Sequence, residues 1–352
     1  AILAQRLFAE LPLASTVLVL NGVVWASLIL AMRSILQRIS INWSSHKSCR
    51  AAWNSCYPKM IAVHSRHFKL SQKSLAAASL ALAATSEAHA ATQSKPDSAT
   101  KEAPSTEFQG KVALVTGAAK GMGREISRRL IESGARVILV DLDEKSLQEN
   151  VAAMGPRASY VACDLRKLDE ARAMFEKMGC ADEVDLLVNC AGVAIFQEFA
   201  AVTEDVWDMT MEVNAKAVFF LSQYFAKGMA KKGSGSIVNI SSQSSGIVVS
   251  TKHHCYSTSK AAVDHITRLS AISLAKSNIR VNAVNPTVVR TELAIKAHGE
   301  EGLKKMAAKI PLGKICECDD VADAVLFLLS DKASMITGVT LPVDGGFIAS
   351  RP

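Results

Sequence analysis

The chain has 352 residues, of which 49% are hydrophobic and 21% charged, a balance typical of a globular protein rather than a disordered or fibrous one. The formal net charge is +7, but residues 1–109 hold 11 Lys and Arg against 5 Asp and Glu, whereas residues 110–352 hold 29 against 28. A nucleic-acid-binding domain needs a basic surface of its own, so this balance argues against nucleic acid as a partner. The eight cysteines form no CxxC pair, and we predict neither a metal site nor a disulfide framework.

Residues 1–91 are predicted to be a targeting presequence. No acidic residue occurs between Glu10 and Glu87, and the intervening sequence is rich in Ser and carries eight Lys or Arg. Such a composition is typical of an organelle transit peptide, with the mitochondrion as the expected destination and a plastid as the alternative. Residues 92–108 are rich in Ser, Thr, Lys, Pro and Glu, and are predicted to be a flexible linker.

Two apolar stretches leave other interpretations of this region open. Leu11–Met32 has 22 uncharged residues, enough to cross a bilayer as a helix, so a membrane-anchored form is an alternative to cleavage. Leu75–Ala84, followed by an Ala-x-Ala sequence, resembles the end of an export signal. Met32 is an alternative start of the protein, in which case residues 1–31 are a translated leader.

Residues 109–352 are predicted to form one α/β domain. Short β-branched runs alternate with amphipathic helical stretches, a pattern that predicts a Rossmann-type, doubly wound parallel sheet with helices on both faces. In such a sheet, ligands bind at the carboxyl ends of the strands. The seven predicted strands are Val112–Thr116, Arg136–Val140, Ser159–Cys163, Asp185–Asn189, Ser236–Ser241, Arg280–Val284 and Thr340–Val343.

The first predicted strand leads into a glycine-rich loop and a helix. Its residues include Gly117, Lys120, Gly121, Met122 and Gly123. Glycines there permit a tight turn and close approach of the backbone to a pyrophosphate, whose charge the helix N-terminus stabilises. Asp141 ends the next strand, 18 residues after Gly123, where a carboxylate accepts the hydroxyls of an adenosine ribose. Asp141 therefore predicts a preference for NAD, while Lys120 leaves NADP as an alternative.

Tyr256 and Lys260 are spaced i, i+4, so they share one face of a predicted helix. A tyrosine is a poor base at its ordinary pKa of about 10. A nearby ammonium lowers that pKa, so the phenol can exchange a proton with a substrate oxygen near neutral pH. Ser242, at the end of the fifth strand, can hydrogen-bond the same oxygen. The three residues predict acid/base catalysis alongside a cofactor that carries the hydride.

Together, these motifs resemble the short-chain dehydrogenase/reductase family over about residues 108–350. The matching segments are Thr116–Gly123, Asn189–Gly192, Ile240–Ser242, Tyr256 with Lys260, and Val343–Gly346. The resemblance implies an NAD(P)-dependent enzyme that interconverts a secondary alcohol and a ketone. It also implies a homotetramer built on the helices 202–231 and 256–276, with a dimer as the alternative.

The resemblance assigns further roles. Asn214 becomes the fourth catalytic residue, holding a water that links Lys260 to solvent. Cofactor contacts are implied for Asp164, Leu165, Asn189, Ala191, Gly192, Tyr256, Lys260, Pro286, Val289 and Thr291. Two departures stand out: Cys190 replaces the second Asn of the usual Asn-Asn-Ala-Gly, and Tyr256 follows Ser242 by 14 residues, one more than the family usually has.

Segments Ser241–Gln243 and Asn285–Val289 resemble the xylulose reductase and polyol dehydrogenase branch of the family. Substrate contacts are then implied for Ser242, Gln243, His253 and Tyr256. Hydrogen-bonding groups of this kind reject substrates that lack matching hydroxyls. A 3-oxoacyl or other lipid carbonyl reductase is one alternative function, and a non-catalytic, membrane-associated subunit is another. Residues 293–310 are predicted to form a helix that closes over the substrate.

Overall fold

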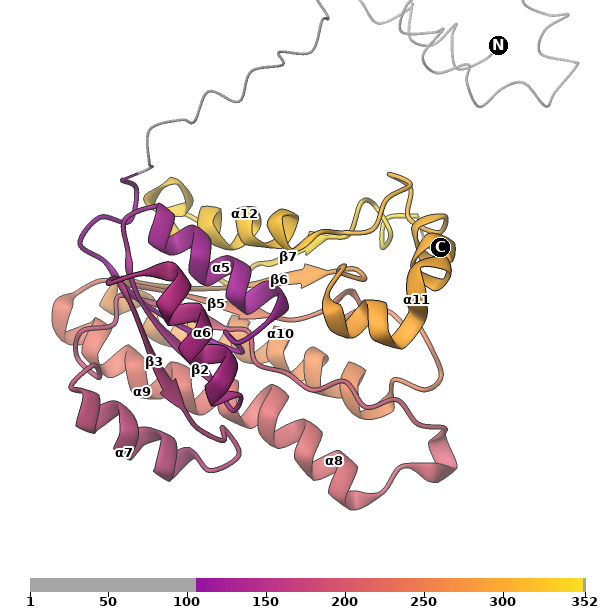
Figure 1. Ribbon diagram of the computed structural model, residues 1–352, viewed down its shortest axis with the longest axis horizontal. Helices are drawn as coiled ribbons and strands as arrows, with labels where there is room; N and C mark the ends of the chain where they lie inside the picture. Colours follow the sequence, from indigo (N-terminus) through magenta and orange to yellow (C-terminus); the bar gives the residue numbers. More distant parts are fainter. Residues whose placement is uncertain (1–105, 351–352) are drawn as a thin grey trace, which may run out of the picture. The chain divides into compact units, whose positions relative to one another are not determined.

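The computed structural model describes residues 106–350. The predicted presequence, the apolar segment 11–32 and most of the linker lie outside the described residues. The described chain forms a seven-stranded parallel sheet with the order β3-β2-β1-β4-β5-β6-β7, and helices cover both of its faces (Figure 1). The predicted fold class is therefore confirmed.

The strands lie close to their predicted positions. They are β1 (Val112–Thr116), β2 (Arg136–Asp141), β3 (Ala158–Ala162), β4 (Leu186–Asn189), β5 (Gly235–Ile240), β6 (Ile279–Pro286) and β7 (Thr340–Val343). β1 and β7 have the predicted bounds, and the others differ by one or two residues at an end. The register pairs Val115 with Val188 across β1 and β4, between which the strand order reverses.

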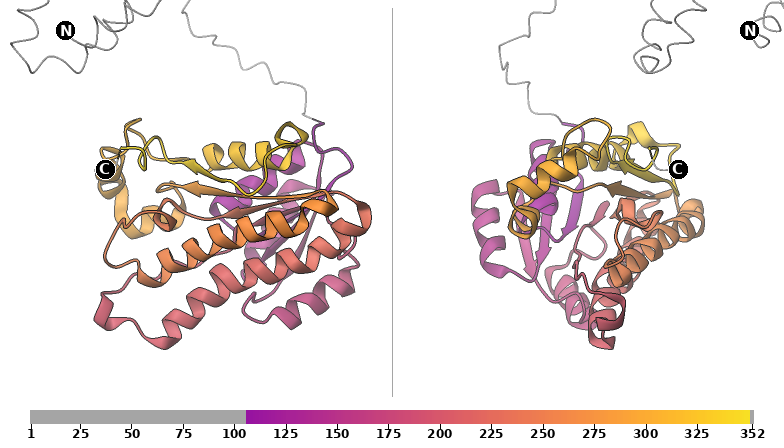
Figure 2. Two further views of the ribbon diagram at one scale, coloured as in Figure 1. Left: turned by 180° about the vertical axis from the view of Figure 1, so that it is seen from behind. Right: turned by 90° about the vertical axis from the view of Figure 1, so that its right-hand side faces the viewer.

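Six helices sandwich the sheet (Figure 2). One face carries α5 (Gly121–Glu132), α6 (Glu144–Met154) and α12 (Cys318–Leu329). The other face carries α7 (Leu168–Met178), α9 (Ala217–Lys232) and α10 (His254–Leu274). α8 (Glu204–Met211) precedes α9, and α11 (Glu292–Ala307) lies beyond the carboxyl end of β6, at the right of Figure 1.

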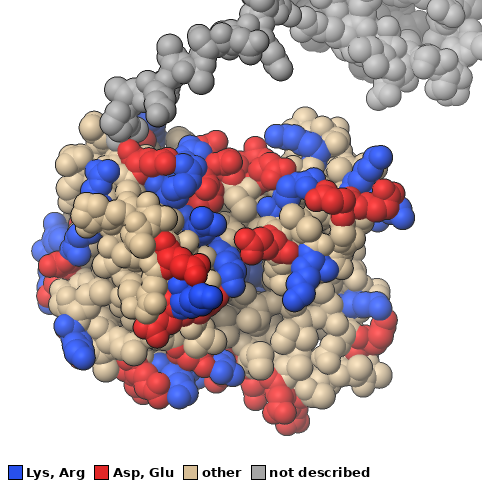
Figure 3. Space-filling view, in the orientation of Figure 1, with Lys and Arg blue, Asp and Glu red and all other residues tan. Residues whose placement is uncertain are grey.

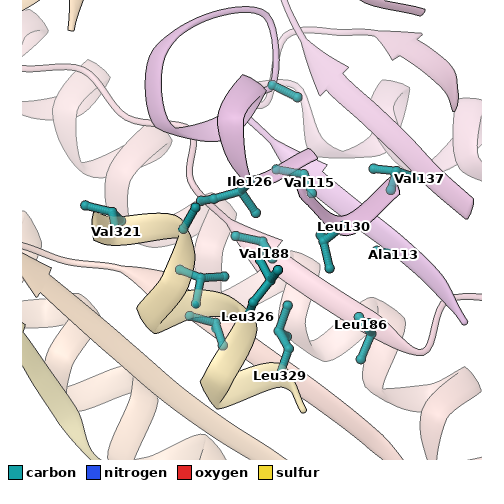
Figure 4. Close-up of a cluster of buried hydrophobic side chains, with 14 of the residues drawn as sticks. Ala113, Val115, Ile126, Leu130, Val137, Leu186, Val188, Val321, Leu326 and Leu329 are labelled. Carbon is teal, nitrogen blue, oxygen red and sulfur yellow. The ribbon is translucent and has the colours of Figure 1, made fainter. Parts of the chain in front are cut away.

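Successive strand residues contribute side chains to two hydrophobic cores, one on each face of the sheet, because side chains alternate between the faces of a strand. Val115 and Val188 pack with Leu326 of α12 and with α5 (Figure 4). Leu114 belongs to the opposite core, with Phe225 of α9. A parallel sheet covered on both faces needs apolar residues at consecutive positions, which explains the continuous apolar runs of the sequence.

Two predicted helices are interrupted. The stretch predicted as one helix over 202–231 contains a π-helical turn, η3 (Glu212–Lys216), between α8 and α9. α11 is broken at Gly299, whose φ of 63° and ψ of 169° are not helical. Across residues 106–350, no helix is long and apolar enough to cross a membrane.

Candidate active site

The predicted site residues meet along one edge of the sheet, at the carboxyl ends of the strands. The glycine loop follows β1, Asp141 ends β2, Asn189 ends β4 and Pro286 ends β6. Ser242 lies two residues beyond β5. The strand order reverses between β1 and β4, which is where a doubly wound sheet opens a crevice for a ligand.

The glycine loop is packed too closely for any side chain at two of its positions. A Cβ on Gly123 would lie 2.1 Å from the Gly117 carbonyl oxygen, and one on Gly117 would lie 2.8 Å from the Ala191 Cα. Thr116 Oγ1 accepts hydrogen bonds from the backbone N–H of Cys190 and Ala191, at 3.0 and 3.1 Å. The loop is thus fixed against the segment after β4, with the N-terminus of α5 placed as the fold requires for a pyrophosphate.

Asp141 is held by the backbone around it. Its Oδ1 accepts from the N–H of Leu142 and Asp143, at 2.7 and 3.1 Å, and its Oδ2 accepts from Ala119 N–H at 3.1 Å. Lys120, the predicted reason for tolerating NADP, places its Nζ 2.7 Å from Asp143 Oδ2. This ion pair raises the pKa of Lys120 and lowers that of Asp143. Asp143 therefore balances the charge of Lys120, a role that the sequence analysis missed.

The residues implied to contact the adenosine differ in what their side chains do. Asp164 pairs with Arg166, which lowers the pKa of the carboxyl group, while Leu165 is buried beside it. Asn189 is buried, and its Nδ2 donates to Ser222 Oγ at 3.1 Å and to Asn239 Oδ1 at 2.8 Å. The Asn189 Nδ2 is thus used within the protein, while its Oδ1 has no hydrogen-bond partner, and the implied cofactor contact of this residue stays a prediction.

The residues after β6 approach the glycine loop. Thr291 is the N-cap of α11, where its Oγ1 accepts from Ala294 N–H at 3.1 Å. Its methyl carbon lies 3.2 Å from the position of a Cβ on Gly121. Val289 is buried and pairs with Cys316 as an isolated parallel bridge. The glycine loop and the start of α11 therefore lie next to each other, and their implied contacts with one dinucleotide stay predictions.

Lys260 lies on α10, and its ammonium reaches the end of β5. The residue is 4% exposed; its Nζ donates to the Ile240 carbonyl oxygen at 2.7 Å, while Ser241 Oγ donates to the Lys260 carbonyl oxygen at 3.1 Å. Burial lowers the pKa of Lys260 from 10.5 to about 8. At neutral pH, the residue therefore keeps its charge within a largely dry environment.

Tyr256 lies on the same face of α10, with Lys260 Nζ 5.8 Å from the centre of its ring. Its pKa is raised by burial, while a hydrogen bond with Ser242 works in the opposite direction. The expected lowering of this pKa by Lys260 is absent, because burial of the phenol outweighs the hydrogen bond with Ser242. Tyr256 is consequently protonated at neutral pH, and its catalytic role stays a prediction.

Ser242 is buried at the start of a short 3-10 turn, η4 (Gln243–Ser245). Its Oγ accepts from Ser244 N–H at 3.2 Å and lies 2.9 Å from Ser244 Oγ. The turn fixes the hydroxyl beside Tyr256, as the sequence predicts for a residue that binds the reacting oxygen.

Asn214 lies in the π-helical turn and is fully buried. Its Oδ1 accepts from Val193 N–H at 2.8 Å, and its Nδ2 donates to the Val193 carbonyl oxygen at 2.9 Å and to Ser259 Oγ at 3.0 Å. A Cβ on Gly192 would lie 3.3 Å from Asn214 Oδ1 and 3.5 Å from Lys260 Nζ. The Asn214 side chain thus holds the backbone after β4 against the lysine, and its predicted water-binding role stays a prediction.

An aromatic wall that the sequence analysis missed borders Tyr256. Phe196 stacks on His253 with ring centres 4.1 Å apart and meets the Tyr256 ring edge-on at 5.9 Å. Burial and the charge of His298 lower the pKa of His253. Nothing in the residue type of Phe196 marks it, because only the folded loops bring it to the site.

Several side-chain polar atoms of the described residues are buried without a hydrogen-bond partner. Two of them, Oε1 of Gln243 and Nδ1 of His253, belong to residues predicted to bind substrate; two more, Oε1 of Gln197 and Nε2 of His254, belong to the residues next to Phe196 and His253. The loop that carries His253 is fixed to the one after β4, since Gln197 N–H donates to the Lys252 carbonyl oxygen at 3.1 Å and Lys252 pairs with Glu198 at 2.8 Å. The loop before His253 is therefore fixed to its neighbour, while Gln243 lies in the turn η4.

No three His, Cys, Asp or Glu residues within 106–350 are grouped to hold a metal, and the six cysteines in that range are free thiols. Burial raises the pKa of the Cys190 thiol to about 12. Acidic and basic side chains are interleaved over the face shown in Figure 3, without a broad patch of one sign.

Comparisons with known proteins agree with this geometry. The family described as enoyl-(acyl carrier protein) reductase matches residues 117–348. L-xylulose reductase from Bos taurus is 44% identical over 243 residues, which cover 68% of this chain and 98% of that protein. An NAD-dependent glycerol dehydrogenase from Listeria innocua is 38% identical, covering 67% and 93%. A solved short-chain dehydrogenase/reductase family protein superposes with a TM-score of 0.65 at 34% identity, covering 69% and 99% of the two chains.

Proposed function

The chain belongs to the short-chain dehydrogenase/reductase family of NAD(P)-dependent oxidoreductases, and we propose that its substrate is a small polyol or the corresponding ketose. The observation that carries the proposal is the pair of buried, unpartnered atoms, Gln243 Oε1 and His253 Nδ1. An unpaired buried polar atom costs about 1–3 kcal/mol, so a ligand with hydroxyls at those positions removes a penalty that an alkyl chain cannot. Similarity to L-xylulose reductase and to a glycerol dehydrogenase supports the same substrate class.

The chain's own residues supply the proton chemistry. When bound, the nicotinamide provides or accepts the hydride. Tyr256 is protonated at neutral pH, so it donates its phenolic proton to a ketone oxygen during reduction and recovers a proton in the reverse direction. Ser242 hydrogen-bonds the same oxygen and orients it. The Lys260 ammonium, one turn along α10, stabilises the phenolate that remains after donation.

We also propose that the enzyme prefers NAD. The Asp141 carboxylate, fixed by three backbone N–H groups, is suited to the ribose hydroxyls and repels a 2′-phosphate. Asp143 forms an ion pair with Lys120, and this pairing neutralises the nearby cation that would otherwise attract that phosphate. We expect Asp141→Ala to relax the preference. A ratio of kcat/KM that favours NADPH in the unaltered protein would refute this assignment.

The substrate proposal is tested by a dinucleotide-linked activity screen of the purified protein over polyols and ketoses, hydroxysteroids and 3-oxoacyl substrates. We expect turnover of polyols and ketoses, while turnover confined to acyl substrates would show a lipid carbonyl reductase instead. Tyr256→Phe is the control for chemistry: it should lose nearly all turnover and still bind NADH. Normal turnover by this variant would remove Tyr256 from the mechanism.

Delivery and assembly are proposed on separate grounds. The acid-free, basic composition between Glu10 and Glu87 supports import into mitochondria, with removal of residues 1–91. Sequencing the N-terminus of the mature protein tests this, and a retained segment 11–32 would indicate a membrane anchor instead. Exposed apolar side chains on α9 and α10 support a homotetramer that buries these helices.

A further inference from the structure

Asp264 is a buried acid to which the reaction described above gives no role. It follows Lys260 by one turn of α10 and Tyr256 by two, so the three side chains share one face of the helix. The residue is 8% exposed. Carboxylates are rarely buried to this extent unless partners compensate for the lost water.

Its partners come from two other segments of the site. Asp264 Oδ2 lies 2.6 Å from Ser245 Oγ and accepts from Asn285 Nδ2 at 3.1 Å. Ser245 Oγ in turn lies 2.8 Å from the Ser242 carbonyl oxygen, and Asn285 directly precedes Pro286 at the end of β6. The carboxylate therefore joins the helix of Tyr256 and Lys260 to the turn of Ser242 and to the strand end beside it.

Asp264 also acts on the charge of Lys260. Burial lowers the pKa of Lys260, and two acidic groups oppose that effect: Cys190, from the segment after β4, and Asp264. The Cys190 thiol, with its pKa raised to about 12, is uncharged at neutral pH. Tyr256, the other titratable group beside the ammonium, is protonated there as well. Asp264 is thus the acidic side chain one turn from Lys260 on the same face of α10, and it favours the charged form of the buried ammonium.

We infer that Asp264 is a positioning residue of this active site: its carboxylate provides the counter-charge of Lys260 and anchors the turn that carries Ser242. The inference rests on the proposed function for its kinetic consequences only. Asp264 then has two roles: it helps to place the Ser242 hydroxyl, and it favours the charged form of Lys260.

Asp264→Asn in the full-length chain tests the counter-charge. The amide keeps an oxygen for Ser245, and Asn285, whose Oδ1 has no partner, can turn its own amide to match. Without the negative charge, Lys260 loses its proton more readily. The alkaline limb of kcat/KM, expected near pH 8 in the unaltered protein, should move down by about one pH unit.

Ser245→Ala is the matched control, because it removes the hydroxyl bridge and keeps the charge. We expect a lower kcat with the alkaline limb unmoved. Superimposable pH profiles for the unaltered protein and Asp264→Asn would overturn the counter-charge role, whatever the loss of rate. If Asp264→Asn does not fold, Asp264→Glu replaces it in the test. The alkaline limb of kcat/KM for Asp264→Glu should stay at the pH of the unaltered protein, and a shift of that limb would overturn the inference.

A second readout needs no turnover. Thermal unfolding between pH 7 and 10.5 reports the pKa of Lys260, since the cost of burying its charge disappears as the folded protein releases the proton. In Asp264→Asn, this rise in stability should begin at a pH about one unit lower than in the unaltered protein. In a Lys260→Met background, the substitution should produce no such shift, and a persistent shift would refute the link. If no polyol is turned over, the proposed function fails, and this comparison still decides the role of Asp264.

Discussion

Lys260 carries a positive charge that is almost completely withdrawn from water. Its pKa falls to about 8 because the single hydrogen bond to Ile240 and the charge of Asp264 only partly replace hydration. The charged form of Lys260 therefore lowers the stability of the folded protein.

Lys260→Met should therefore inactivate the protein and stabilise it. A lowering of 2.5 pKa units corresponds to about 3 kcal/mol, from which the lost hydrogen bond to Ile240 removes about 1 kcal/mol. Below pH 8, Lys260 is charged in both the folded and the unfolded chain, so the variant has its full advantage there. Between pH 8 and 10.5 the folded protein becomes neutral first, its stability rises, and the advantage disappears.

Denaturant unfolding of both proteins across this pH range checks the prediction. A variant that is less stable than the parent at pH 7 would contradict the account of Lys260. A difference in stability that does not change with pH would contradict it as well, because a loss of packing alone does not titrate.

The sequence alone predicted those residues whose relation is local. Tyr256 and Lys260 share a face because helix geometry places residues i and i+4 together, and Gly117 and Gly123 were marked by the turn they must make. Phe196 could not be found in this way, because only the folded loops bring it to Tyr256. Asp264 lies on the helical face of Lys260, but its hydrogen-bond partners Ser245 and Asn285 come from other segments, and only the folded chain brings them into contact.

At the scale of elements, the strand pattern was predictable because a sheet buried on both faces demands uninterrupted apolar runs. The π-helical turn between α8 and α9 was not. It inserts one extra residue per turn into a helix whose apolar pattern continues through it, so the periodicity gives no sign of it. That turn carries Asn214, whose amide holds the backbone beside Lys260, so the unpredicted irregularity positions a residue that the resemblance predicts to be catalytic.

The N-termini of α5 and α6 are joined by the ion pair of Lys120 and Asp143, each the N-cap of its helix. Asp143→Ser keeps a good cap for α6 and removes the charge that balances Lys120. The freed ammonium can then attract a 2′-phosphate. Because exposed ion pairs are weak, we expect the Kd for NADPH, relative to that for NADH, to fall only about three- to fivefold.

Titration of protein fluorescence with both dinucleotides measures this ratio. The double variant Lys120→Ala with Asp143→Ser is the control, and it should lose the gain because the cation is gone. If the ratio of the Kd values for NADPH and NADH is unchanged in Asp143→Ser alone, the ion pair has no part in the cofactor preference, and Asp141 sets it.

At the scale of the whole molecule, charge and apolar surface suggest different partners. The interleaved charges of Figure 3 offer no polyanion a continuous basic surface. The outer surface of α10, in contrast, exposes Leu269 and Ile272 at 57% and 79%, and Phe219 of neighbouring α9 is 40% exposed. Apolar groups gathered on two adjacent helices favour burial against a second copy.

Ile272→Glu should therefore break the proposed assembly. A carboxylate placed in the centre of an apolar interface loses hydration without gaining a partner, which costs more than such an interface gains from one side chain. We expect light scattering after gel filtration to show a tetramer for the unaltered protein and a smaller species for the variant. Leu142→Glu, an equally apolar and 68% exposed position beyond β2, should leave the mass unchanged. An unaltered mass for Ile272→Glu would place the interface elsewhere, and a monomeric parent would remove the assembly altogether.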